Sequence, residues 1–122
     1  MTIKSAAIAP PYSIILINDP TNRFVPEWKD GPVVSGTDSC LFISCMAEVD
    51  GKTEFTLGNV KEVSPEAHLV FDGIINTPSS KISLETAECD PVIEIPTSGQ
   101  RTRIWIWANS TSRPDKVIIG IE

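Results

Sequence analysis

The sequence predicts an all-β protein: a two-layer antiparallel β-sandwich of about eight short strands, with little or no helix. Runs rich in β-branched residues recur at a spacing of about 8–12 residues, and Pro, Gly, Asn or Asp separate them. No long stretch has the apolar spacing of an amphipathic helix. A length of 122 residues suits one domain, so residues 1–122 are expected to form a single β-sandwich.

The first expected strand covers residues 12–18, between the pair Pro10-Pro11 and the pair Asp19-Pro20. Its residues are apolar on both faces, which is typical of a central strand in a two-layer protein. The next two expected strands cover residues 40–48 and 52–57. The dipeptide Asp50-Gly51 between them predicts a β-hairpin with a type I′ turn.

Residues 81–86 alternate between polar and apolar, which places Ile82 and Leu84 on the inner face of a strand. Residues 92–95 are expected to form a strand at a sheet edge, because Pro91 and Pro96 flank them. The last strand is expected at residues 116–121.

Residues 100–108 predict a strand with Ile104 and Ile106 on one face and Trp105 and Trp107 on the other. One of these pairs must belong to the core. We expect the tryptophans there, and an exposed aromatic platform is the alternative.

The chain is acidic, with a formal net charge of −6 from 16 acidic and 10 basic residues. This balance argues against direct nucleic-acid binding and against anionic membrane surfaces. It indicates either an acidic protein with no particular partner or one that binds a basic protein partner. Three cysteines, without a C-x-x-C spacing, predict reduced thiols and a cytoplasmic location. No metal or cofactor site is expected. His68 is the single histidine and no G-x-S-x-G motif is present, so we expect no enzymatic activity.

Two features stand out as candidate partner-binding elements. The first is Trp28, in a proline-rich loop after the first expected strand, which either plugs the end of the sandwich or stands out as a binding anchor. The second is an acidic run between Lys81 and Arg101 that contains no base. The run consists of Glu85, Glu88, Asp90 and Glu94. It is either a solvated edge that discourages aggregation or a negative patch that meets a basic partner.

With these strands laid out, the chain resembles the competence protein J family, the inhibitors of a DNA-entry nuclease. The features that match are the opening YSIILINDPTNRFVPEWKDG, the segment CLFISCMAEVDGKTEFTLG, the aromatic strand TRIWIWA and the closing KVIIGIE. The resemblance rests on the hydrophobic pattern, the strand order, Tyr12, Trp28 and Trp107. It implies an all-β protein without catalytic activity that binds and silences a nuclease, as a toxin-immunity protein also would.

The function expected from the sequence is therefore inhibition of a basic partner protein, in particular a nuclease. Trp28 would be the anchor, and the four acids would guide association. Two alternatives stay open: a ligand-binding module that stacks carbohydrate on tryptophan, and a structural β-domain that assembles with copies of itself.

Overall fold

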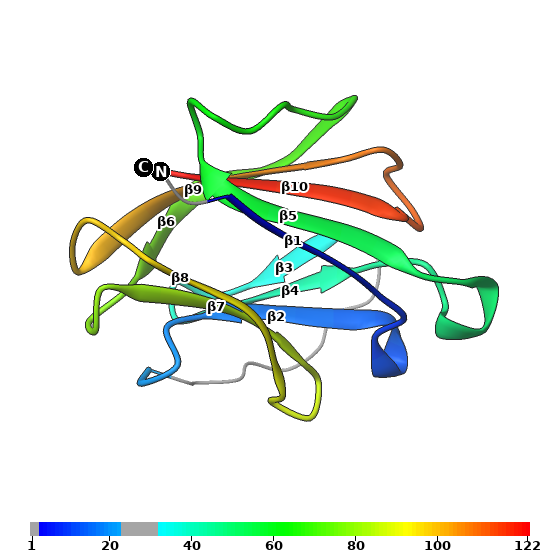
Figure 1. The fold of residues 1–122 in the computed structure, drawn as a ribbon, viewed down its shortest axis with the longest axis horizontal. Coiled ribbons are helices and arrows are strands. Elements are labelled where there is room, and N and C mark those ends of the chain that lie inside the picture. Colours follow the sequence, from blue (N-terminus) through cyan, green and yellow to red (C-terminus); the bar gives the residue numbers. More distant parts are fainter. Residues whose placement is uncertain (1–2, 23–31) are drawn as a thin grey trace.

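The computed structural model describes residues 3–22 and 32–122, so Trp28 lies outside the described residues. The described part is a sandwich of two five-stranded sheets that face each other (Figure 1). It confirms the predicted all-β sandwich. None of the helices in these ranges is long and apolar enough to cross a membrane.

The described residues contain ten strands and two short 3₁₀ turns. The strands are β1 (Ile3–Ile8), β2 (Ile14–Asn18), β3 (Val34–Gly36), β4 (Cys40–Ser44), β5 (Thr53–Asn59), β6 (His68–Asn76), β7 (Lys81–Thr86), β8 (Pro91–Pro96), β9 (Arg101–Ala108) and β10 (Lys116–Ile121). The 3₁₀ turns are η1 (Pro11–Ser13) and η2 (Glu48–Asp50).

We name the two sheets A and B. Sheet A has the strand order β1-β5-β10-β9-β6, and sheet B has the order β3-β4-β2-β7-β8. The pairing of β5 with β10 is parallel, and the other strand pairs are antiparallel. As predicted, β2 lies inside its sheet and β8 lies at an edge. The strands at residues 81–86 and 116–121 begin and end where the sequence placed them.

The core lies between the sheets and is built from alternating side chains of both. Ile82 and Leu84 point inward from β7 as predicted, and both are fully buried. On β9 the expectation is wrong: Ile104 and Ile106 are fully buried in the core, while Trp105 and Trp107 lie half-buried on the outer face of sheet A. Burying each of these isoleucines stabilises the fold by about 1.5–3 kcal/mol.

The predicted hairpin at Asp50-Gly51 is also wrong, because β4 belongs to sheet B and β5 to sheet A. The connection crosses from one layer to the other through η2. Its two ends bond to the β9–β10 connection: the Met46 N–H donates to the Pro114 carbonyl (2.9 Å) and the Glu54 N–H to the Asp115 carbonyl (2.8 Å). A type I′ turn needs positive φ at both central residues. Among the described residues Gly51 has positive φ (131°) and Asp50 does not.

The strand β6 contains Asp72 and Gly73 as ordinary ladder residues, and its irregularity falls between Leu69 and Phe71. The Phe71 ring lies over Gly73, where a Cβ atom would meet the ring at 2.7 Å. Gly73 therefore makes room for an aromatic side chain on its own strand and does not make a turn.

Candidate partner-binding surface

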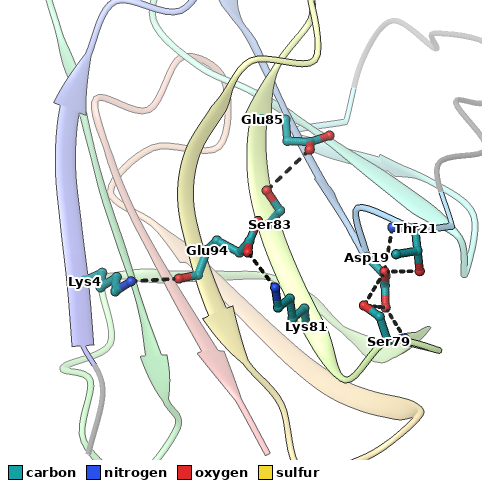
Figure 2. Close-up of polar contacts among 8 residues, drawn as sticks. All are labelled: Lys4, Asp19, Thr21, Ser79, Lys81, Ser83, Glu85 and Glu94. Carbon is teal, nitrogen blue, oxygen red and sulfur yellow. Dashed lines mark hydrogen bonds and ion pairs between the residues drawn. The ribbon is translucent and has the colours of Figure 1, made fainter.

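The four acids that the sequence singled out occupy different environments in sheet B. Glu88 and Asp90 are exposed in the turn between β7 and β8. Glu94, on edge strand β8, pairs with Lys81 at 3.3 Å, and its side chain is 40% exposed. Glu85, on β7, is 1% exposed and accepts a hydrogen bond from the Ser83 hydroxyl at 3.4 Å (Figure 2). The structure thus brings Glu88 and Asp90 together at the surface and places Glu85 inside.

Glu85 is buried because the outer face of sheet B is itself buried at this point. Leu16 of β2 lies between Glu85 of β7 and Phe42 of β4, and both Leu16 and Phe42 are almost completely buried. Asn18, Cys40 and Ser83 form the neighbouring row and are fully buried. Glu85 therefore does not belong to a solvent-exposed acidic edge.

The β7–β8 turn holds its two exposed acids on a well-bonded frame. The Thr86 N–H donates to the Asp90 carbonyl (2.9 Å), the Cys89 N–H donates to the Thr86 carbonyl (2.8 Å), and the Asp90 N–H donates to the Thr86 hydroxyl (3.2 Å). Half-buried Cys89, which has a φ of 65°, packs against the small apolar cluster that contains Leu16. The turn thus presents Glu88 and Asp90 to solvent from a fixed position.

The edge strand β8, which carries Glu94, lies against the edge strand β1 of the other sheet. The Lys4 ammonium of β1 donates to the main-chain carbonyl of Glu94 at 3.0 Å, so the edge strands of sheets A and B lie side by side (Figure 2). With Lys81 on its carboxylate and Lys4 on its carbonyl, Glu94 lies between two cations. Its charge is therefore less available to a partner than those of Glu88 and Asp90.

Asp19, at the end of β2, is a fully buried carboxylate with a structural role. It accepts hydrogen bonds from the N–H and hydroxyl groups of Thr21 (2.8 and 2.7 Å) and of Ser79 (2.7 Å from each) (Figure 2). Burial alone would raise the pKa of Asp19. The hydrogen bonds from Thr21 and Ser79 outweigh it, so the pKa lies below its ordinary value of 3.8. Asp19 ties the chain after β2 to the turn between β6 and β7.

The outer face of sheet A carries the two tryptophans. The Arg103 guanidinium lies over the Trp105 ring at 4.6 Å and pairs with Asp72 at 3.1 Å. Leu69 and Ile74 of β6, 53% and 46% exposed, are the cross-strand neighbours of Trp107 and Arg103. This surface is apolar and locally charge-balanced.

The remaining reactive side chains are the single histidine, the three cysteines and the other acids. His68 is exposed at the start of β6. Within residues 3–22 and 32–122, no group of three or more His, Cys, Asp or Glu residues could hold a metal ion. Cys40, Cys45 and Cys89 are reduced and carry thiol groups. Burial raises the pKa of Cys45 to about 11, which makes it a poor nucleophile at neutral pH.

Tyr12 is a surface residue that the sequence pattern did not reveal, because the pattern placed it inside the first expected strand. In the structure Tyr12 belongs to η1 and is 74% exposed. The two prolines before it were the available signal, since they favour a turn where a continuous strand was expected to begin.

No protein-family model and no curated protein sequence matches this chain. Two solved structures share its fold. ComJ from Bacillus subtilis, described as the inhibitor of the DNA degrading activity of NucA, superposes with a TM-score of 0.68 at 15% identity, over 99% of this chain and 98% of ComJ. The protein described as crocagin biosynthetic gene J superposes with a TM-score of 0.52 at 11% identity, over 99% of this chain and 97% of its own. The resemblance expected from the sequence is confirmed at the level of the fold, which this chain shares with ComJ.

Proposed function

We propose that this protein is a nuclease inhibitor, which binds a DNA-degrading enzyme and excludes its substrate without chemical turnover. The observation that carries the proposal is the likeness to ComJ over the full length of both chains. An inhibitor of this kind needs a rigid surface and no catalytic groups. A sandwich whose connections are joined by main-chain hydrogen bonds supplies such a rigid surface.

The proposed mechanism is steric and electrostatic. A nuclease groove that holds a DNA backbone carries cationic groups, and carboxylates can occupy the places of the phosphates. The chain has a net charge of −6, and its β7–β8 turn presents Glu88 and Asp90. Glu94 and Trp28 stay candidate contacts, with Trp28 outside the described residues. Glu85 is left out of the contact set because it is buried.

The proposal is tested by capture and inhibition. The purified protein is immobilised and exposed to an extract of its source cell, and the DNA-degrading activity left in the extract is measured. We expect the activity to be depleted and the eluted nuclease to be inhibited by fresh protein in solution. A rise in salt should weaken inhibition, because charge attraction is screened. Undiminished activity at every protein concentration would contradict the proposal.

Charge reversal tests the acids separately. The double variant Glu88→Lys, Asp90→Lys should inhibit more weakly than the wild type, with an unchanged unfolding transition, because both side chains are exposed. Glu66→Lys is not a suitable control, because Glu66 pairs with Lys116 at 3.0 Å. Asp38→Lys is the better control, since Asp38 is exposed on the β3–β4 connection. Equal inhibition by the turn variant and this control would remove the turn from the contact set.

The two alternative functions have less support. Stacking of carbohydrate on tryptophan is disfavoured because the Arg103 guanidinium already lies over Trp105. A cavity of about 300 Å³ at the β8–β9 end of the sandwich contains no tryptophan. It is lined by Asn59, Glu62, Ile95, Pro96, Thr97, Ser98, Ile121 and Glu122. Self-assembly through β8 is disfavoured because this edge lies against β1.

A further inference from the structure

Tyr12 is held out in solvent by a strained backbone. It is 74% exposed, with φ 61° and ψ 11°, and the following Ser13 has φ 60°. Two consecutive left-handed residues that are not glycine are unfavourable, and they persist only where the surroundings determine them. Here the Ser13 N–H donates to the Pro10 carbonyl (3.1 Å) and the Ser13 carbonyl accepts from the Cys45 N–H (3.0 Å). Such strain is concentrated at functional sites.

Acidic turns lie on both sides of Tyr12. In the sheet B ladder, Ile15 pairs with Thr86 of β7 and Ile14 pairs with Ser44 of β4. The β7–β8 turn, with exposed Glu88 and Asp90, is therefore on one side of η1. The chain that leads from β4 into η2 is on the other side, and η1 and η2 touch. Figure 1 shows the β1–β2 corner and the β4–β5 connection at the same end of the sandwich.

The turn η2 adds a second exposed apolar side chain to this end. Val49 is 88% exposed, and its neighbours Glu48 and Asp50 are also exposed. None of the acids Glu48, Asp50, Glu88 and Asp90 belongs to an ion pair in the described part of the chain. The bases on the adjoining connections are Lys52 and Arg113. We call this end the Tyr12 surface, made of Tyr12, Glu48, Val49, Asp50, Glu88 and Asp90.

We infer that the Tyr12 surface is the part of this protein that enters the cationic cleft of its protein partner, with Tyr12 as the buried anchor. The inference rests on the proposed function and names the contact surface for it. Interfaces bind most strongly through a few central residues, among which tyrosine is enriched, and a polar rim surrounds them. Here the rim is acidic, which fits a partner whose cleft is basic. The strained turn fixes the backbone that carries the ring before binding, so less backbone freedom is lost on association.

The test uses the DNA-degrading nuclease that the immobilised wild-type protein retains from its source-cell extract. Tyr12→Gly removes the ring, and glycine adopts a φ of 61° without strain, so this variant should fold at least as stably as the wild type. Tyr12→Asn is a second variant that tolerates the left-handed conformation while limiting extra flexibility. Leu69→Ala is the matched control, because Leu69 is 53% exposed on the outer face of sheet A. Unfolding transitions of all the variants confirm that they are folded.

We expect wild type and Leu69→Ala to inhibit the nuclease equally, and both Tyr12 variants to need at least a tenfold higher concentration. Inhibition by both Tyr12 variants at the wild-type concentration would overturn the inference and leave the proposed function standing. Loss of inhibition in Leu69→Ala alone would also overturn it and would move the interface to sheet A. If the wild-type protein does not inhibit at all, the proposed function fails and the inference fails with it.

Discussion

The carboxylate of Asp19 accepts hydrogen bonds from both the N–H and the hydroxyl of Ser79, which follows it by 60 residues. The two residues join the end of β2 to the β6–β7 turn, so a contact distant in sequence fixes one end of sheet B. The start of the segment that leads to Trp28 is held by the same carboxylate through Thr21.

Asp19→Ala is expected to lower the free energy of unfolding by about 2–3 kcal/mol, because hydrogen bonds to a charged group contribute about 1.5–3 kcal/mol and the donors would be left unpaired. Urea denaturation measures the change. Asp38→Ala is the control, since Asp38 is exposed and its variant should unfold like the wild type. If both variants unfold at the same urea concentration, the Asp19–Ser79 contact does not stabilise the fold.

Asp19 should also make the free energy of unfolding depend on pH in the acidic range. Its pKa is lower in the folded state than the ordinary value of 3.8, so folding favours the ionised form. Its contribution is then complete above pH of about 4 and is lost as the pH falls through the lower folded pKa. Thermal unfolding measured from pH 6 downward should show a steeper loss for wild type than for Asp19→Asn. Parallel curves would show that the carboxylate has no such role.

The two faces of β9 should respond differently to truncation. Ile106→Ala is expected to lower the free energy of unfolding by about 2–5 kcal/mol, because it leaves a cavity in the core. Trp105→Ala should cost less, since the ring is half-buried on the outer face and is contacted by Arg103. Urea denaturation compares the variants directly. A larger loss for Trp105→Ala would show that the tryptophans form the core.

The cysteines should react in a set order. Cys89 is half-buried in a surface turn, while Cys40 and Cys45 are buried, and the Cys45 pKa is raised to about 11. A thiol reagent at pH 8 should therefore modify one cysteine per native chain quickly and three after denaturation. The variant Cys89→Ser should lose the fast phase. A fast phase that survives in this variant would assign it to another cysteine.

The local sequence pattern predicted correctly those strands whose bounds do not depend on which other strands they pair with. The alternation in residues 81–86 and the apolar residues that follow Lys116 were enough to place β7 and β10. At Asp50-Gly51 the local turn signal predicted a hairpin that does not form. Long-range pairing decides the fold there, because β5 pairs with β1 and β10 and not with β4. For β9, alternation separated isoleucines from tryptophans but contained no information on which face meets sheet B.

The candidate surface was predictable only in part, because the exposure of a side chain depends on long-range packing as well as on local sequence. Glu88 and Asp90 lie in a turn, where exposure follows from local structure. Glu85 shares the outer face of β7 with Ser83, and an outer face is normally wet. It is nevertheless buried, together with its neighbours Leu16 and Phe42 on the adjoining strands. The two prolines before Tyr12 indicated a turn, but the exposure of its ring followed only from the strained turn before β2.

One titration tests the central claim most directly. A fixed amount of the captured nuclease is mixed with rising amounts of this protein, and the degradation of fluorescent DNA is followed. We expect the rate to fall to zero near a fixed molar ratio, with the inhibitor recovered unchanged afterwards. DNA that is degraded at the original rate in a large molar excess of this protein would contradict the account.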